Sequence, residues 1–257
     1  MWEKEMAIAH QAAQEAGKAL LDLLGKNTAI TKKGHIDLVT EADVRSERII
    51  LDFITRLFPQ DSILTEEAGE YRHRPDRVWI LDPLDGTTNF AHQFPFFAVS
   101  IALEIEKEVA LGVVFNPLCR ECFHAIMGGG AFLNGTPISV SQTRTLQDSL
   151  LGTGFPYDIH QEPDRVLENF RRFVVRAQGV RRPGSAALDL CYVAAGRLDG
   201  FWEEGLKPWD TAAGVLIVKE AGGMLSTYEG RPYSPYEKSI IASNPFIHGL
   251  MVEALAT

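Results

Sequence analysis

A single stretch, WILDPLDGTTNF, begins at Trp79 and constrains the fold of this chain more than any other feature. Its apolar start predicts a buried strand that brings Asp82 to its end, because Pro83 has no N–H with which to continue the hydrogen-bonded ladder. The chain must then turn at once. Asp85 can return towards Asp82 and leave the Leu84 carbonyl between the two carboxylates. Hard oxygens of this kind are ligands that Mg²⁺ accepts, so the stretch predicts a metal site at a strand end.

The glycine after the second carboxylate indicates an anion site beside the metal. Gly86 permits the tight backbone of the turn, and residues 86–89 can open a helical turn whose free N–H groups and positive dipole end face an anion. An ordinary turn is the alternative, because Asp, Pro and Gly are also selected in turns for local backbone reasons. A metal and phosphate site therefore requires partners elsewhere in the chain.

Three other segments supply acids in suitable positions. Glu66 follows the strand-like run 62–64, so a second acidic cluster also lies at a strand end. Asp210 precedes a helical run of small residues, where helix capping is its local alternative. Thr40 and Asp43 are spaced as a capping box at the start of an amphipathic helix, which explains them in part.

Hydrophobic spacing predicts helices and then a meandering sheet in the first half of the chain. Two long helices are expected before the first strand, over residues 2–25 and 40–58. The strands that follow are expected at 78–81, 97–103, 109–115 and 121–126. A hairpin at Asn134-Gly135 is then expected to join strands 131–133 and 138–140.

From residue 150 onwards short strands alternate with helices, which indicates a layered α/β half. The strands are expected at 150–153, near 180 and at 199–203, and the helices at 162–177, 185–196 and 210–221. The chain thus divides into residues 1–145, an α+β half with most of the candidate metal ligands, and residues 146–257, an α/β half. The two halves are tightly fused and can count as one domain, because no flexible linker separates them. Periodicity alone predicts a mixed α/β fold with two sheets.

Composition disfavours several classes of function. The chain has 257 residues, 46% of them hydrophobic, and can bury a large core. Its net charge of −9 argues against a nucleic-acid surface. Three cysteines do not indicate a disulfide framework, and the CxxC spacing of Cys119 and Cys122 lacks the second pair that zinc requires. Neither a targeting signal nor an apolar run of membrane-spanning length occurs, so we expect a cytoplasmic protein without membrane contact.

Taken together, these segments resemble a known family. The segments that carry the resemblance are, in chain order, DLVTEAD from Asp37, TEEA from Thr65, WILDPLDGTTNF from Trp79, GSAAL from Gly184 and PWDTAAG from Pro208. They resemble the inositol monophosphatase family of Mg²⁺-dependent, lithium-sensitive phosphatases over nearly the whole chain. The resemblance implies a five-layer αβαβα sandwich, a homodimer, and hydrolysis of small phosphate monoesters.

The resemblance also implies a ligand set for two or three Mg²⁺ ions, with Mn²⁺ as an alternative and Li⁺ as an inhibitor. Glu66, Asp82 and the Leu84 carbonyl would hold one ion. Asp82, Asp85 and Asp210 would hold the next, so that Asp82 bridges them, and a third, weaker ion would rest mainly on Glu66 and water. These are hard oxygen ligands, with too few nitrogen or sulfur ligands for zinc.

A water activated by metal is the nucleophile that the resemblance implies. Thr87, with Asp43 behind it, would orient and deprotonate this water, and Glu66 belongs to the same catalytic group. The amides of Gly86 and Thr87 would hold phosphate oxygens. Thr88 either takes part in substrate binding or caps the turn.

Substrate recognition is expected in the second half of the chain. Gly184, Ser185 and Ala186 match the family's sugar-side loop, Glu203 matches the acid that accepts hydrogen bonds from polyol hydroxyls, and Asp210 would serve both metal and substrate. The local alternatives are a helix-start turn for the loop and a solvated acid for Glu203. The favoured substrate is myo-inositol 1-phosphate.

Other activities stay open. Arg181 and Arg182 could clamp a second phosphate, as a dual inositol monophosphatase and fructose-1,6-bisphosphatase requires, although the charge of Glu203 disfavours this and a solvated arginine pair is the local alternative. Lys32 could approach the third metal or the substrate phosphate. Histidinol phosphate and 3′-phosphoadenosine 5′-phosphate are less favoured substrates. A non-catalytic, metal-dependent regulatory protein is the alternative from another class, and the intact ligand set argues against it.

Overall fold

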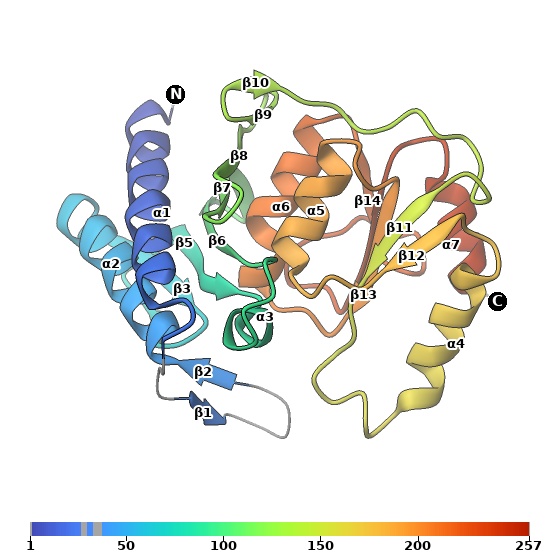
Figure 1. The fold of residues 1–257 in the computed structure, drawn as a ribbon. Helices are drawn as coiled ribbons and strands as arrows, with labels where there is room; N and C mark the ends of the chain where they lie inside the picture. The colour runs from blue at the N-terminus through green and yellow to red at the C-terminus, as the bar shows by residue number, and fades with distance from the viewer. Residues whose placement is uncertain (1, 27–29, 33–37, 257) are drawn as a thin grey trace.

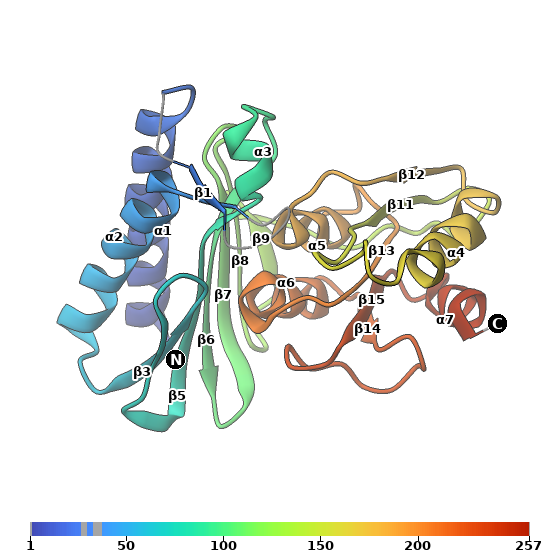
Figure 2. The same ribbon diagram turned by 90° about the horizontal axis from the view of Figure 1, so that it is seen from below.

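The chain folds into five alternating layers of helices and sheets (Figures 1 and 2). The structure, a computed structural model, describes residues 2–26, 30–32 and 38–256. Across the molecule the layers are α1 (Glu3–Leu23) with α2 (Glu41–Leu57), an eight-stranded sheet, α5 (Ala186–Ala194) with α6 (Pro208–Glu220), a five-stranded sheet, and α4 (Pro163–Val174) with α7 (His248–Ala256). This is the αβαβα sandwich that the resemblance implies. None of the described helices has the length and apolar character needed to cross a membrane.

The larger sheet has the strand order β10-β9-β8-β7-β6-β5-β3-β4. Its strands are β3 (Asp61–Thr65), β4 (Gly69–Tyr71), β5 (Arg74–Asp85), β6 (Ala98–Ile105), β7 (Glu108–Asn116), β8 (Glu121–Ile126), β9 (Ala131–Leu133) and β10 (Thr136–Pro137). From β5 to β10 each strand pairs antiparallel with the next, which confirms the predicted meander. The prediction that residues 138–140 form the second strand of the Asn134-Gly135 hairpin was wrong, because the strand that pairs with β9 is Thr136–Pro137. Asn134 and Gly135 both have positive φ and form a two-residue turn, so pairing resumes at once with Thr136 opposite Leu133.

The prediction that β5 ends at Asp82 was also wrong. The strand continues through Pro83 to Asp85, and its register against β6 shifts between Asp82, which is opposite Ser100, and Asp85, which is opposite Ala98. The extra residue forms a bulge, a position at which a sheet tolerates proline. The bulge places both carboxylates at the end of one strand.

Two short strands lie between the first two helices, contrary to the prediction that two long helices precede any strand. β1 (Ile30–Lys32) and β2 (Leu38–Thr40) pair antiparallel. A three-residue strand shows too little alternation to be recognised by periodicity. Thr40 ends β2 in an extended conformation and caps α2, and its capping box with Asp43 is confirmed. The side chain of Lys32 lies outside the part of the structure that is described.

The smaller sheet has the strand order β12-β11-β13-β15-β14. Its strands are β11 (Leu150–Thr153), β12 (Gly179–Arg181), β13 (Gly200–Glu204), β14 (Met224–Ser226) and β15 (Ser239–Ser243). The alternation predicted up to residue 221 is confirmed. Three elements that follow that point, β14, β15 and α7, were not predicted.

Helices α5 and α6 are sandwiched between the two sheets and join the halves of the chain. One hydrophobic core contains Ile80 and Phe123 from the larger sheet, Leu190 and Leu216 from the two helices, and Ile240 from the smaller sheet. Because the halves share this core, they are built as one packed unit. The division near residue 145 stays a prediction.

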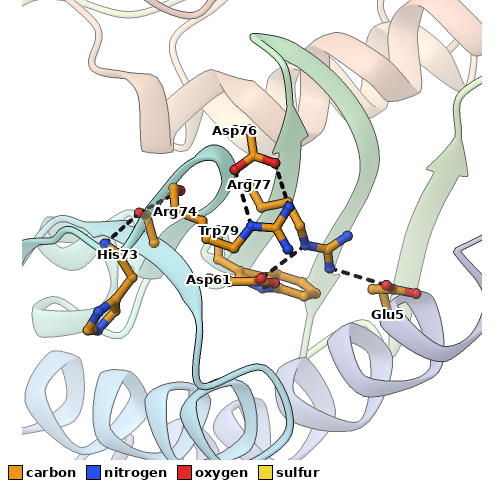
Figure 3. A network of polar contacts seen from close by, with 8 residues as sticks. Glu5, Asp61, His73, Arg74, Asp76, Arg77 and Trp79 are labelled. Atoms are coloured by element: carbon orange, nitrogen blue, oxygen red, sulfur yellow. Dashed lines mark hydrogen bonds and ion pairs between the residues drawn. The ribbon is translucent and has the colours of Figure 1, made fainter.

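A polar network fastens β5 to its neighbours on the side of α1 (Figure 3). The Arg77 guanidinium donates to Asp61 on β3 at 3.0 Å and to Glu5 on α1 at 3.2 Å. Trp79 Nε1 donates to the other oxygen of Asp61, also at 3.0 Å. This network holds the start of the strand whose far end carries Asp82.

Candidate active site

A pocket of about 250 Å³ opens where β5, α3 (Thr87–Ala91), α5, β13 and α6 meet. Ten of the residues predicted for the site line this pocket: Glu66, Asp85, Gly86, Thr87, Thr88, Gly184, Ser185, Ala186, Glu203 and Asp210. The three remaining residues, Asp43, Asp82 and Leu84, are buried in the protein. The structure therefore brings together residues that are up to 144 positions apart in the chain (Glu66 to Asp210).

Negative charge is concentrated around Asp82. Burial, reinforced by the neighbouring carboxylates of Glu66, Asp85 and Asp210, raises the pKa of Asp82 well above its usual range. The Leu84 N–H donates to Asp82 Oδ1 at 3.0 Å, which opposes this rise only in part. A buried group of carboxylates is unfavourable unless cations or protons balance it.

The donor atoms around Asp82 fit a hard divalent cation. Four carboxylates and the nearby Leu84 carbonyl offer only oxygen, which suits Mg²⁺ or Mn²⁺ and not zinc. Within the part of the chain that the structure describes, no three or more acidic, histidine or cysteine side chains already form a metal-binding cluster. The ligand roles of Glu66, Asp82, Leu84, Asp85 and Asp210 therefore stay predictions.

Asp85 is held by the N-terminus of α5. Its Oδ2 accepts hydrogen bonds from Ser185 Oγ at 2.5 Å and from the Ala187 N–H at 2.8 Å. Burial nevertheless raises the pKa of Asp85 to about 6. The Ser185 hydroxyl was predicted to face the substrate, but it donates its hydrogen bond to Asp85. Ala187 was missed by the sequence analysis, although its place in the first turn of a helix that begins with GSAAL could have indicated such a contact.

Thr87, which lines the pocket, contacts the buried Asp43. Thr87 Oγ1 lies 2.8 Å from Asp43 Oδ1 and 3.1 Å from the Leu84 carbonyl oxygen. Asp43 Oδ2 accepts from the N–H and the hydroxyl of Thr40, each at 2.7 Å. Asp43 therefore caps α2 with one oxygen and reaches Thr87 with the other. Burial raises its pKa, and these hydrogen bonds lower it.

The turn into α3 is tightly enclosed. Gly86 has a φ of 95°, and a Cβ there would lie 3.0 Å from the Phe96 carbonyl and 3.2 Å from the Gly184 carbonyl. Any other residue would meet both backbone strain and these two oxygens. Asn89, another residue that the sequence analysis missed, donates from Nδ2 to the carbonyls of Phe96 at 2.7 Å and Pro183 at 2.8 Å. It ties α3 to the Gly184 loop.

The opposite wall of the pocket carries Glu203 and Asp210. Glu203 is buried near the end of β13, and burial together with the nearby Asp210 charge raises its pKa well above its usual range, while Arg182 lowers it. Asp210 lies in the first turn of α6, where its Oδ2 accepts from the Lys207 N–H at 2.6 Å. The capping role considered for Asp210 is therefore present beside its position in the pocket.

The two consecutive arginines differ in their surroundings. Arg182 lines the pocket, and its guanidinium lies 5.6 Å from the centre of the Phe155 ring. Arg181 does not line the pocket, and its Nη1 donates to the Val180 carbonyl at 3.1 Å. Only Arg182 is placed to contact a substrate.

The chain was compared with known proteins. Residues 1–257 match the family model described as the inositol monophosphatase family. An inositol-1-monophosphatase of Synechocystis sp. is 47% identical over 98% of this chain and 88% of the relative. The Nus factor SuhB of Escherichia coli is 43% identical over 93% of this chain and 90% of the relative. The structure of an inositol monophosphatase from Anabaena matches with a TM-score of 0.90 at 42% identity, covering 99% of this chain and 96% of that one. In sequence over its whole length and in fold, the chain belongs to the inositol monophosphatase family.

Proposed function

We propose that this protein hydrolyses small phosphate monoesters in a Mg²⁺-dependent reaction and that myo-inositol 1-phosphate is its favoured substrate. The observation that carries the proposal is the group of acids around the buried Asp82, namely Glu66, Asp85 and Asp210. The relative named inositol-1-monophosphatase supports the choice of substrate.

The residues proposed to hold Mg²⁺ are Glu66, Asp82, Asp85, Asp210 and the Leu84 carbonyl. When bound, the ions would offset the charge of the phosphate ester and lower the pKa of a water molecule. The protein contributes rigid placement of these groups. Asp85 in particular is fixed by two hydrogen bonds from α5, and such partners orient a carboxylate that binds a metal.

Other residues act on the water and the ester. Thr87 Oγ1, which is paired with Asp43 at 2.8 Å, would orient the attacking water and pass its proton to the buried carboxylate. Gly86 and Thr87 would donate their backbone N–H groups to phosphate oxygens. On the far wall Glu203 would accept a hydrogen bond from a hydroxyl of the leaving alcohol.

Phosphate release from myo-inositol 1-phosphate in millimolar Mg²⁺ tests the proposal. Asp85→Asn and Asp210→Asn should retain the fold, judged by circular dichroism, and lose at least about a thousandfold in turnover. Asp52→Asn, on the exposed side of α2, is the matched control and should behave as the wild type. Activity of the wild type on no small phosphomonoester would overturn the proposal, and near-normal turnover of either variant would overturn the ligand roles.

A second candidate is dual activity on fructose 1,6-bisphosphate, which the position of Arg182 on the pocket favours and the charge of Glu203 opposes. Arg182→Ala should then reduce bisphosphate turnover selectively. Arg181→Ala is the control, because Arg181 does not line the pocket. Equal loss on mono- and bisphosphates would reject a clamping role for Arg182.

Four further properties are proposed from the family membership: inhibition by Li⁺, activity with Mn²⁺, a homodimer, and a place in the cytoplasm. The first two can be read from the same phosphate-release assay, and light scattering measures the oligomer. A non-catalytic regulatory role, with which the relative named Nus factor SuhB is consistent, is the alternative from another class. Retention of the whole carboxylate set favours catalysis.

A further inference from the structure

The carboxylate of Glu203 lies directly over the backbone of Gly154, and both residues line the pocket. A methyl group built on Gly154 would overlap both carboxylate oxygens and the Cδ of Glu203. Van der Waals repulsion forbids this overlap, so the present position of the Glu203 carboxylate requires residue 154 to have no side chain.

Sheet register explains why the two residues meet. β11 and β13 run parallel with Thr153 beside Trp202, so Gly154 comes next to Glu203. The Thr153 hydroxyl donates to the Trp202 carbonyl at 2.8 Å and fastens the strand ends together. Trp202 packs into the core against Phe173, and because side chains alternate along a strand, Glu203 points to the other face, towards the pocket.

The backbone does not require glycine at this position. Gly154 is not among the glycines with positive φ, in contrast to Gly86 and Gly184. A left-handed φ therefore does not exclude alanine here, and the space taken by Glu203 is a separate reason for glycine.

We propose that Gly154 is a specificity-determining residue, because the space above it seats the carboxylate that recognises a hydroxyl of the leaving alcohol. Gly154 acts through Glu203 and is thus a positioning residue. The substrate class that it selects is phosphate monoesters of polyols with a free hydroxyl near the ester. This inference rests on the proposed function of the pocket.

Gly154→Ala tests whether the space above Gly154 is needed to hold the Glu203 carboxylate, and the test compares two substrates. Myo-inositol 1-phosphate carries hydroxyls beside the ester, and p-nitrophenyl phosphate carries none on its leaving group. We expect kcat/KM for inositol 1-phosphate to fall at least about tenfold more than that for p-nitrophenyl phosphate, the value of one hydrogen bond to a charged group, with the loss mainly in KM. An equal loss on both substrates would overturn the proposal.

Two further variants separate this role from general damage to β11. In a Glu203→Ala background, Gly154→Ala should cause no further selective loss, because the added methyl group then meets no carboxylate. Gly152→Ala, two residues earlier, places its methyl 2.9 Å from Leu198 Cδ1 and not on Glu203. It should affect both substrates equally. A selective loss with Gly152→Ala, or an undiminished one in the Glu203→Ala background, would contradict the proposal.

Thermal unfolding tests the seat without any activity. Gly154→Ala should lower the Tm of the wild type and leave the Tm of Glu203→Ala unchanged or higher, since alanine also restricts the unfolded chain. Gly249→Ala in α7, whose methyl group would meet nothing within 4 Å beyond its chain neighbours and the backbone of its own helix, is the control for a glycine-to-alanine change. If the wild type hydrolyses neither substrate, the proposed function fails. The Tm values of the single and double variants still show whether the Glu203 carboxylate occupies the space above Gly154. An equal loss of Tm in the wild-type and Glu203→Ala backgrounds would overturn the proposal that Gly154 makes room for the Glu203 carboxylate.

Discussion

At the scale of single residues, the acids of the pocket combine a local structural role with a place in the site. Asp43 caps α2 with one oxygen and contacts Thr87 with the other. Asp210 caps α6 and lines the pocket. The sequence suggested that each aspartate is either a helix cap or a site residue. In the structure each of the two caps a helix and also belongs to the site. The N-termini of α2 and α6 both lie at this site, so the aspartates in their first turns lie there too.

We expect Asp82→Asn to stabilise the metal-free protein at neutral pH while removing its activity. The substitution removes one carboxylate from a group of four, of which Asp82 and Asp85 are buried and Glu66 and Asp210 are partly exposed, and it keeps an oxygen that can accept from the Leu84 N–H. Thermal unfolding in EDTA should show a higher Tm than the wild type, and phosphate release should be lost. A lower Tm in EDTA would mean that the repulsion inferred around Asp82 is absent.

Thr87→Val isolates the role of the threonine hydroxyl, because valine keeps the branched shape of threonine. We expect turnover to fall about a hundredfold, the range for loss of a group that handles a proton. Asp43 keeps its two hydrogen bonds from Thr40, so the free energy of unfolding should change by less than about 2 kcal/mol. Thr87→Ser, which retains the hydroxyl, is the control. Full activity in the valine variant would exclude Thr87 from catalysis.

At the scale of helices and strands, long periodic elements were predictable, whereas the short strands β1, β2 and β4 and the bulge in β5 were not. The helices at α1 and α2 and the meander from β5 to β9 follow from hydrophobic spacing. The passage of β5 through Pro83 depends on the partner strand β6, which periodicity within β5 does not reveal. Strands β1, β2 and β4 have three residues each and too few alternations to stand out, whereas β9, which is equally short, is marked by the Asn134-Gly135 turn.

The network in Figure 3 predicts a large cost for removing Asp61. Asp61→Ala would leave Arg77 with its bond to Glu5 alone and Trp79 Nε1 without its acceptor. We expect the free energy of unfolding to fall by about 2–4 kcal/mol, as when one partner of a buried charged network is deleted. Urea unfolding measures this. Asp76→Ala, which removes the exposed pair with Arg74, is the control and should cost less than about 1 kcal/mol.

The contact between α1 and β8 should make stability sensitive to acid. The His10 ring packs edge-on against His124, and its Nδ1 lies 3.2 Å from Cys122 Sγ, a group of side chains that the sequence analysis did not foresee. Burial, and next the charge of His124, lowers the pKa of His10 to about 4. The unfolded chain, with a His pKa near 6.5, then binds more protons than the folded protein between these values. Stability is therefore lost as the pH falls from about 6.5 to about 4.

Urea unfolding at pH 7 and pH 5 checks this dependence. The contribution of His10 should be about 1–2 kcal/mol, because the ring is only partly buried and solvent screens part of the effect. His10→Gln should lose less stability than the wild type between the two pH values, while His92→Gln, at an exposed position, should lose as much as the wild type. Identical losses in His10→Gln and the wild type would contradict the prediction.

At the scale of the whole molecule, the site is assembled from both halves of the chain. Asp82 and Asp85 come from the larger sheet, whereas Glu203 and Asp210 come from the second half, and α5 and α6 pack between them in a shared core. The sequence could predict the candidate residues because each lies in a recognisable segment, near the end of a strand or the start of a helix. It could not predict pairings across the halves, such as Ser185 with Asp85 or Gly154 with Glu203, because these depend on how the layers stack.

The carboxylates around Asp82 are proposed to hold metal ions for phosphate ester hydrolysis, so removing and restoring the metal should switch activity off and on. Phosphate release from myo-inositol 1-phosphate is followed in Mg²⁺, after EDTA, and after Mg²⁺ is added back, for the wild type and Asp82→Asn. We expect that EDTA abolishes release by the wild type, that Mg²⁺ restores it, and that Asp82→Asn is inactive throughout. Release that persists in EDTA, or in Asp82→Asn, would contradict this expectation.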